Sequence, residues 1–390
     1  MFGALSAALS AGYGVLFTVV GDFRDEYGIS ETAIGLVIGA GFLAAFVAQV
    51  LIAPVADRGR ARQLVIVGVA ANVIGLLMMG FGDSLELILA GRIISGLGIG
   101  AAQPAIRRIV ILADPDHLGQ NLGRLLSADV FGFAIGPAVS AILAGPAGLA
   151  APFVVVAAAT AVLLPATFFV SANETTKASR QRLAIDLLRS RAVAGAVVLG
   201  SAVFLMIGAF DALWDIVHED LDTPTWMANL GITLFAVPLV ILGPTGGRLS
   251  QRVGPFRVAA AGLLIAAVFM FTYGQLPTGA WIFALTMLHA MTDGLTVAAS
   301  GVAVAMAAPA DRQAGAQGVM GAAQSLTAGL TAIVIGAVYE DAGRAVAYAA
   351  SAVGMVGLTA IGMALAAPFW RDRQHRDAPP TRAETARLLS

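Results

Sequence analysis

The sequence contains no cysteine, and only 12% of its 390 residues are charged. Without cysteine there are no disulfides, no thiolate nucleophiles and no cysteine-ligated metal sites. Soluble chains carry roughly a quarter charged residues, so this chain has few side chains that can face water. Because 58% of the residues are hydrophobic and the mean hydropathy is +0.85, the composition predicts an integral membrane protein.

Other absences exclude whole classes of function. The only lysine, Lys177, follows no glycine-rich loop, so the sequence offers no P-loop and no ATP site. It has neither an H-E-x-x-H zinc motif nor a G-x-S-x-G nucleophile motif. The net charge of −1 gives no basic surface for nucleic acid. We therefore expect no enzyme, no cofactor and no metal site.

Long apolar runs recur along the whole chain. Roughly 20 consecutive apolar residues cross a bilayer as one helix, and most of these runs have about that length. The pattern predicts an all-α membrane protein with twelve transmembrane helices, at residues 3–21, 31–54, 63–81, 85–106, 122–143, 149–170, 193–214, 226–246, 256–275, 279–303, 315–338 and 344–368.

A polar stretch divides these runs into two groups of six. A shift of 194 residues places ISETAIGL (29–36) on TPTWMANL (223–230), which indicates two parallel repeats. We expect the linker to carry a short helix on the membrane surface and the tail to be flexible. The predicted parts are an N-terminal six-helix bundle (1–170), a cytoplasmic linker (171–192), a C-terminal six-helix bundle (193–369) and a cytoplasmic tail (370–390).

Basic residues collect in alternate connections. With a cytoplasmic N-terminus, all but three of the 23 lysine and arginine residues lie in segments that face the cytoplasm. The exceptions are Arg24, Arg344 and Arg92, the last of which lies within a span. Positive residues mark the cytoplasmic side, so we predict a multi-pass protein of the plasma or inner membrane with both termini in the cytoplasm.

Three segments carry recognisable motifs. The loop after the second run reads APVADRGRAR and groups Asp57 with Arg58, Gly59, Arg60 and Arg62. Its second-half copy, residues 247–254, has Gln251 in place of the acid. The fourth run reads GRIISGLGIGAA from Gly91 to Ala102, and the fifth reads GFAIGPAVSA, which includes Gly132, Gly136 and Pro137.

On these motifs the chain resembles the major facilitator superfamily, and in particular its proton-coupled drug antiporters. The resemblance implies two six-helix bundles in a parallel pseudo-repeat that rock about a central site. Asp57 and the neighbouring arginines would form a cytoplasmic gate of charged hydrogen bonds that breaks when the halves separate. The small residues and proline of the fifth helix would allow close helix packing and bending.

Ionisable residues inside the spans are the candidate site. Such groups are costly in a bilayer unless they have a partner or a wet cavity. His289 and Asp293 are four residues apart and share one helix face, so they could take up and release a proton or form a static hydrogen bond. Asp211 is the second candidate for proton coupling. Asp129 lies close enough to the membrane surface to reach water or the loop arginines.

Arg92 completes the set of intramembrane charges. The family resemblance places it opposite the His289 and Asp293 pair across a central cavity. There it would balance an acid, anchor an anionic substrate or bond neighbouring carbonyls. Aromatic residues are the other candidates for substrate contact, namely Tyr13, Phe17 and Trp214.

These features predict a secondary active transporter that exports small molecules in exchange for protons by alternating access. Two alternatives remain. One is proton-driven uptake of a nutrient or organic anion, and the other is a transporter-like sensor without turnover. The expected partners are a small-molecule substrate, protons and the lipid bilayer, with no nucleic acid and no ATP. We expect a monomer.

Overall fold

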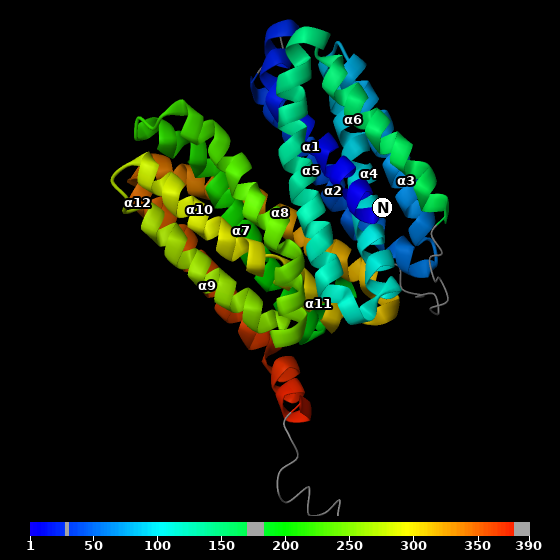
Figure 1. Ribbon diagram of the computed structural model, residues 1–390, viewed down its shortest axis with the longest axis vertical. Helices are drawn as coiled ribbons and strands as arrows, with labels where there is room; N and C mark the ends of the chain where they lie inside the picture. Colours follow the sequence, from blue (N-terminus) through cyan, green and yellow to red (C-terminus); the bar gives the residue numbers. More distant parts are fainter. Residues whose placement is uncertain (28–30, 170–182, 378–390) are drawn as a thin grey trace, which may run out of the picture.

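A computed structural model describes residues 1–27, 31–169 and 183–377, and these residues form helices and short connections without strands (Figure 1). The α-helices are α1 (Phe2–Tyr27), α2 (Glu31–Leu51), α3 (Ala61–Phe81), α4 (Leu85–Ala113), α5 (Leu118–Ala147), α6 (Ala150–Leu163), α7 (Arg191–Asp220), α8 (Thr225–Val253), α9 (Pro255–Tyr273), α10 (Gly279–Thr296), α11 (Ala298–Ala307) and α12 (Gln313–Asp377). The same residues contain the short 3₁₀ helices η1 (Ala53–Arg58), η2 (Pro115–His117), η3 (Leu164–Phe169), η4 (Ile185–Arg189) and η5 (Ala310–Arg312).

The helices agree with the twelve apolar runs. Within the described residues, nine helical stretches are long and apolar enough to cross a membrane, and α6 and the first part of α1 are shorter apolar helices. One stretch, 310–369, holds two spans, because Gly343 (φ 81°) turns the chain inside α12. Only glycine adopts that backbone readily. The all-α membrane fold expected from the sequence is confirmed.

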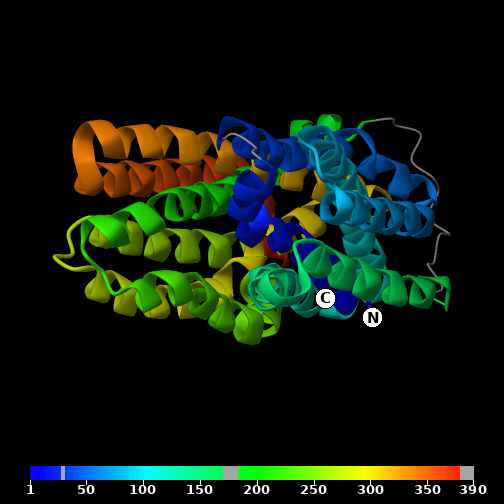
Figure 2. The same cartoon turned by 90° about the horizontal axis from the view of Figure 1, so that it is seen from above.

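The helices form two bundles, one from α1 to α6 and one from α7 to α12. In Figure 2 the two bundles lie side by side, and they meet along two seams. One seam brings α2 against α12, and the other brings α5 against α8. The largest apolar core lies within the C-terminal bundle, between α7, α9 and the two arms of α12.

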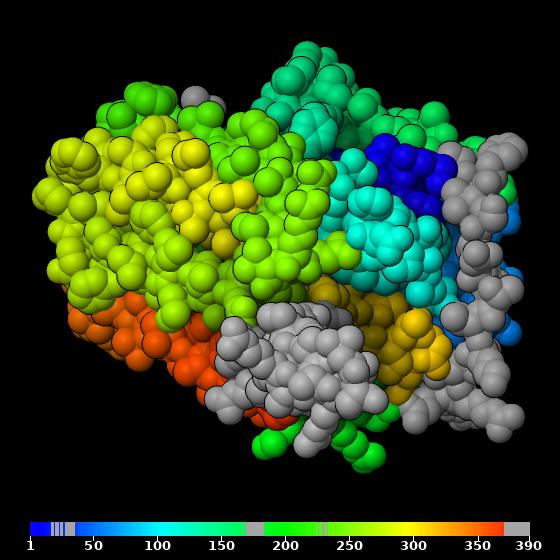
Figure 3. Space-filling view, turned by 60° about the horizontal axis from the view of Figure 1, so that its bottom comes forward, coloured from blue at the N-terminus to red at the C-terminus, as the bar shows by residue number. Residues whose placement is uncertain are grey.

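The close contacts between the bundles gather at one end of the molecule, which we call the closed end. There α5 and α8 pack backbone against backbone, because a Cβ on Gly123 would overlap the carbonyl of Gly243, and one on Gly119 that of Gly247. An apolar cluster also crosses the boundary and joins Ile106 and Leu118 to Val302 and Ala305. Viewed from this end, α8 lies directly against α5 (Figure 3). Toward the other end the bundles diverge (Figure 1).

Some boundaries differ from the sequence expectation. The tenth run is two helices, α10 and α11, which meet at Val297. The tail expected to be flexible from residue 370 begins as helix, because α12 continues to Asp377 through residues that contain neither glycine nor proline after Pro368. Most of the predicted linker, 170–182, lies outside the described residues, and its end forms η4.

Candidate functional site

Asp57 links the two bundles at the closed end. Its Oδ1 accepts hydrogen bonds from Nε of Arg108 at 3.0 Å and from the backbone N–H of Ala314 at 2.9 Å. Its Oδ2 accepts one from the N–H of Gly315 at 2.7 Å. Asp57 and Arg108 belong to the N-terminal bundle, whereas Ala314 and Gly315 form the first turn of α12 in the other bundle. We call these four residues the latch.

The local sequence explains why this carboxylate reaches α12. The helix η1 ends at Gly59, whose left-handed backbone (φ 78°) reverses the chain and leaves Asp57 buried at 3% exposure. The first N–H groups of a helix have no partner within that helix, and its N-terminal end carries partial positive charge. A carboxylate satisfies both needs, so the latch joins two charges and one helix end.

The loop arginines differ in their surroundings. Arg62 donates to the carbonyl of Phe168 at 2.7 Å and lies over its ring at 5.3 Å, and Arg60 is exposed. Arg58 is partly buried. The sequence grouped these arginines with Asp57, but the cation on this carboxylate is Arg108 of α4. The structure therefore moves the charged part of the gate from the loop into a helix.

Gln251 occupies the corresponding position in the second repeat. Its Oε1 accepts a hydrogen bond from the N–H of Gly119 at 2.7 Å, at the start of α5. Its Nε2 donates to the carbonyls of Pro115 and Asp116 at 3.2 and 3.0 Å. Each half thus caps the first turn of a helix in the other half, once with a charged residue and once with a neutral residue.

The end of the linker lies beside the latch. Arg312 of η5 donates to both carboxylate oxygens of Asp186 in η4, at 2.5 and 2.7 Å, and to the carbonyl of Leu183 at 2.9 Å. Hydrogen bonding from Arg312 holds the pKa of Asp186 below its ordinary value. The buried Ala184 faces Gly315, where an added Cβ would lie 2.7 Å from the Cβ of Ala184. The linker therefore contacts the same helix start as Asp57.

His289 and Asp293 form the predicted pair on α10. His289 Nε2 lies 3.4 Å from Asp293 Oδ1, and both side chains are almost fully buried. The hydroxyl of Tyr273 in α9 lies 3.0 Å from His289 Nδ1, and Phe269 stacks on the imidazole with a centroid distance of 4.7 Å. The three polar side chains form a row that joins α9 to α10.

The direction of this row differs from the expectation. The second oxygen of Asp293, Oδ2, has no hydrogen-bond partner among the described residues. Asp293 lines a cavity of about 10 Å³ together with residues of α7 and α9, including Met206, Gly262 and Ala266. That volume is about the space of one water molecule. The pair therefore points into the C-terminal bundle rather than across a central cavity toward Arg92.

Arg92 is fully buried inside the N-terminal bundle. Its guanidinium lies 3.9 Å from the ring centroid of Tyr13 in α1, and it packs on Gly41 of α2. Nε, Nη1 and Nη2 have no hydrogen-bond partner among the described residues, and neither has the Tyr13 hydroxyl. The side chain of Phe17 lies outside the part of the structure that can be described.

The residues predicted on α7 divide between two environments. Asp211 and Asp215 are exposed, one helical turn apart. Trp214 is buried, stacks on Phe210 at a centroid distance of 4.9 Å and fills the space over Gly231 of α8. The sequence predicts Trp214 in a cavity with Asp211, but the two are offset by roughly 60° around the helix, and this offset leaves Asp211 exposed while Trp214 is buried. In this structure Trp214 is a packing residue.

Asp129 and the helix-five motif both face α1. Asp129 accepts hydrogen bonds from Ser6 and from Arg107, the latter at 3.3 Å. Gly132 and Gly136 lie against the backbone of α1, where a Cβ would collide with carbonyls of Ala7 and Ala11. Pro137 lies next to Gly14, where a Cβ would be 3.1 Å from the proline Cδ. The motif therefore brings α5 and α1 into backbone contact.

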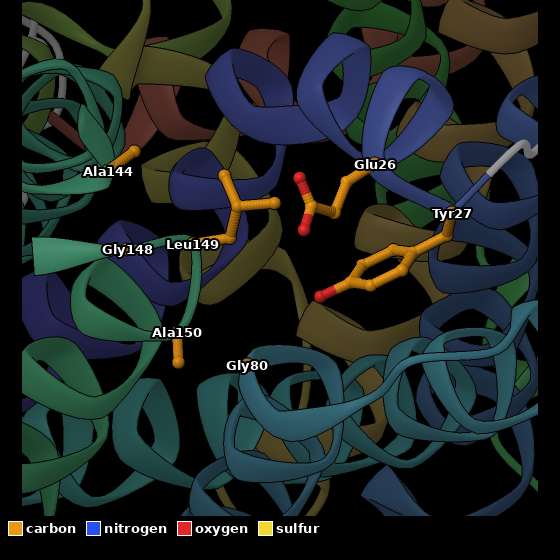
Figure 4. A pocket seen from close by; sticks show the side chains of 7 residues that line it. All are labelled: Glu26, Tyr27, Gly80, Ala144, Gly148, Leu149 and Ala150. Atoms are coloured by element: carbon orange, nitrogen blue, oxygen red, sulfur yellow. The ribbon is translucent and has the colours of Figure 1, made fainter.

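A separate hollow of about 550 Å³ opens at the end of the N-terminal bundle away from the closed end. It lies between α1, α3, α5 and α6, and the side chains of Glu26 and Tyr27 project into it (Figure 4). Its other lining residues are Gly80, Ala144, Gly148, Leu149 and Ala150. None of the residues predicted from the sequence lines it. No group of three or more metal-ligating side chains occurs within the described residues.

Comparison with known proteins identifies the family. The model of the Major Facilitator Superfamily matches residues 2–222 and 198–389, which together span nearly the whole chain. The chain belongs to the Major Facilitator Superfamily. The resemblance drawn from the sequence motifs is confirmed. The protein is accordingly a multi-pass membrane protein and a secondary transporter rather than an enzyme.

Two of the similar curated proteins are multidrug resistance proteins. The chain is 22% identical over 271 residues to the multidrug resistance protein MdtG of Salmonella paratyphi C, which covers 67% of each chain. It is 25% identical over 276 residues to MdtG of Serratia proteamaculans, covering 67% of this chain and 66% of that protein.

Solved structures share the fold at low identity. The proton:xylose symporter XylE bound to 6-bromo-6-deoxy-D-glucose matches with a TM-score of 0.76 at 14% identity, covering 95% of this chain and 94% of that one. The human organic anion transporter MFSD10 matches with a TM-score of 0.73 at 16% identity, covering 93% and 97%. The matches extend over both bundles of the chain.

The sequence pattern does not single out three residues of the site, namely Arg108, Tyr273 and Gly315. Arg108 follows Arg107 directly, and nothing local distinguishes the arginine that binds Asp57. Tyr273 lies at the end of α9, where tyrosine also suits a membrane interface. The carboxylate partner Gly315 contributes only a backbone N–H, which leaves no trace in a side-chain pattern.

Proposed function

We propose that this transporter exports small molecules in exchange for protons, by alternating access between its two bundles. The helix-five motif and the similarity to multidrug resistance proteins support export. The observation that carries the proposal is the latch, in which Asp57 of one bundle holds the helix start of the other. Such a contact is strong while it is formed, and it is lost entirely when the bundles rock apart.

The closed end faces the cytoplasm in this proposal. Arg58, Arg60, Arg62 and Arg312 all lie at this end, and positive residues favour the cytoplasmic side. In this proposal the structure represents a state that is closed on the cytoplasmic side. An exporter needs this state to release its substrate and to collect a proton.

The proton site of the proposal is the row of Tyr273, His289 and Asp293. In the unprotonated state the Nε2–H of His289 faces the Asp293 carboxylate, and the Tyr273 hydroxyl donates to Nδ1. An incoming proton binds Nδ1, while the Nε2–H passes to Asp293, whose new O–H then donates to Nε2. One proton is taken up, and the transfer requires His289 Nε2 and Asp293 Oδ1 to approach from their present 3.4 Å to hydrogen-bond distance.

Asp211 is the second candidate in this proposal. Its exposed position suits a group that exchanges protons or binds a cationic substrate. The domain boundaries near residues 170 and 193, the monomeric state and the membrane orientation complete the proposal. The boundaries are supported by the repeat, and the orientation by the basic residues.

A substrate panel in inside-out vesicles tests the function. Respiration acidifies the vesicle interior, and acridine orange reports that pH. The panel contains ethidium, 1-naphthoate and the neutral 1-naphthamide, with vesicles that lack the protein as the control. Export by exchange predicts that at least one compound alkalinises the interior only when the protein is present. If adding a compound makes the vesicle interior more acidic, the compound and the proton move in the same direction, which indicates symport.

Proton-driven uptake of an organic anion is the second candidate. The buried and unpartnered guanidinium of Arg92 favours it, since a fixed positive charge in a span suits a negatively charged substrate. The same vesicle experiment separates the two, because symport and exchange move protons in opposite directions for a given substrate flux.

A further inference from the structure

The guanidinium of Arg92 has no hydrogen-bond acceptor among the described residues. It is fully buried, and none of its three nitrogens has a partner among the described residues. A guanidinium carries five N–H donors. The face of Tyr13, 3.9 Å away, offers cation–π attraction but no acceptor lone pair. Burying a charged donor is costly in free energy unless a hydrogen-bond acceptor or an opposite charge contacts it.

The surrounding residues hold this guanidinium in place. A Cβ on Gly41 would overlap Nε of Arg92, so α2 leaves room there for the side chain and nothing larger. The Tyr13 hydroxyl is also buried without a partner, which adds a sixth donor to the same site. The Tyr13 ring packs edge-on against Phe42 at a centroid distance of 4.9 Å, and Phe42 is 42% exposed. Tyr13 and Phe42 therefore form an aromatic contact between the covered donors and the surface.

Two acids of this bundle are bound to Arg107 and Arg108, which lie roughly 22 Å along α4 from Arg92 at 1.5 Å per residue. Asp129 binds Ser6 and Arg107, and Asp57 binds Arg108 and the start of α12. Neither is free to neutralise Arg92. The site thus combines a positive charge that has no hydrogen-bonded acid among the described residues with a hydroxyl donor and an aromatic surface.

We infer that Arg92 and Tyr13 bind the carboxylate of an amphipathic organic anion, whose apolar body packs on Phe42. A carboxylate has two oxygens that accept from a guanidinium in parallel, and it can also accept from the tyrosine hydroxyl. Binding requires Phe42 and Tyr13 to turn aside, because the guanidinium is covered in this structure. This inference names a substrate class and rests on the proposed transport function.

Binding to the full-length protein in nanodiscs tests it without transport. The probe is 1-naphthoate, and its matched neutral amide is 1-naphthamide. We expect 1-naphthoate to bind and Arg92→Gln to weaken that binding about tenfold to a hundredfold, the range for a hydrogen bond to a charged group. Tyr13→Phe, which keeps the ring, weakens it about threefold to tenfold. Naphthamide does not compete.

Two further variants keep the test sound. Arg92→Lys retains the charge and restores part of the affinity, whereas loss of folding would abolish binding in both Arg92 variants and lower their melting temperatures. Arg107→Gln alters an arginine of the same helix whose partner is Asp129, and it leaves naphthoate affinity unchanged. Equal binding of acid and amide, no naphthoate binding at 10 mM, or full affinity in Arg92→Gln overturns the inference.

The outcome separates this inference from the proposed function. Proton exchange with ethidium in vesicles, together with no naphthoate binding, would leave the exporter and remove the anion site. Arg92-dependent naphthoate binding without any proton flux would do the reverse.

Discussion

Asp57 Oδ2 accepts a hydrogen bond of 2.7 Å from the backbone N–H of Gly315, a residue of the opposite bundle. The carboxylate is buried, and its other oxygen is held by Arg108 at 3.0 Å. A buried charge without its partner is strongly unfavourable. Opening this end must therefore separate Asp57 from the helix start but can leave Asp57 and Arg108 together, since both lie in the same bundle.

Asp57→Asn should open the closed end. The amide keeps the shape but loses the charge that accepts from the start of α12, and a hydrogen bond to a charged group contributes about 1.5–3 kcal/mol. Because the chain has no cysteine, spin labels can be attached at introduced cysteines alone. Labels at Arg124→Cys and Arg252→Cys should move apart, and labels at Glu26→Cys and Glu219→Cys should approach each other.

Asp114→Asn is the matched control for that measurement. Asp114 lies at the same end, but its partners are His117 and Asn121 within its own bundle, and it is half exposed. Its replacement should leave both label distances unchanged. Equal label distances in Asp57→Asn and in the unmodified chain would show that the latch does not hold the closed end together.

Gln251→Ala should have the same direction of effect and a smaller size. The side chain makes three hydrogen bonds at the start of α5, but it is neutral and partly exposed. A neutral hydrogen bond contributes about 0.5–1.5 kcal/mol. The label distances should shift less than in Asp57→Asn. A larger shift would mean that the second cap dominates closure.

Asp293→Asn should abolish proton coupling without unfolding the protein. Asparagine can still face His289, but it cannot take up the proton. In the vesicle assay the substrate-induced pH change should disappear, while binding of the same substrate remains. The companion variant Tyr273→Phe should slow the proton response, because the imidazole loses the hydroxyl at Nδ1. A normal pH response in Asp293→Asn would move the proton site elsewhere, with Asp211 the next candidate.

The contact between Asp186 and Arg312 should depend on pH. Arg312 lowers the pKa of Asp186 in the folded protein below that of the unfolded chain, which is about 3.9. The contact therefore contributes fully above that value and is lost as the pH falls through the folded pKa. An environment-sensitive dye at Leu188→Cys should report release of the linker below about pH 4. In Asp186→Asn the dye signal should be independent of pH.

The sequence predicted the positions of the membrane spans well, but it predicted poorly which helices pack against each other. Spans follow from the apolar length that a bilayer demands, and α1 to α12 match the runs closely. A membrane helix is apolar on nearly every side, so its pattern does not reveal which face meets which helix. The spacing of His289 and Asp293 correctly put them on one face, and yet that face turned out to be directed at α9.

The gate illustrates the same limit. Asp57 could be selected from its motif, but its partners lie 51 and more than 250 positions away in the sequence. Arg107 and Arg108 differ by one residue, which is a rotation of about 100° around the helix. That rotation alone sends one to Asp129 and the other to Asp57. Such a choice is made by tertiary packing.

Proton-coupled transport is tested most directly by measuring whether reconstituted protein accumulates a substrate under an imposed pH gradient. Liposomes that contain the purified protein and have an acidic interior are mixed with ethidium, 1-naphthoate or the compound that responds in vesicles. Proton exchange predicts that the compound accumulates inside against its own gradient, that a protonophore abolishes the accumulation, and that Asp293→Asn shows none. Accumulation that persists with the protonophore would show that transport is not driven by protons. Accumulation that is unchanged in Asp293→Asn would show that Asp293 does not carry the proton.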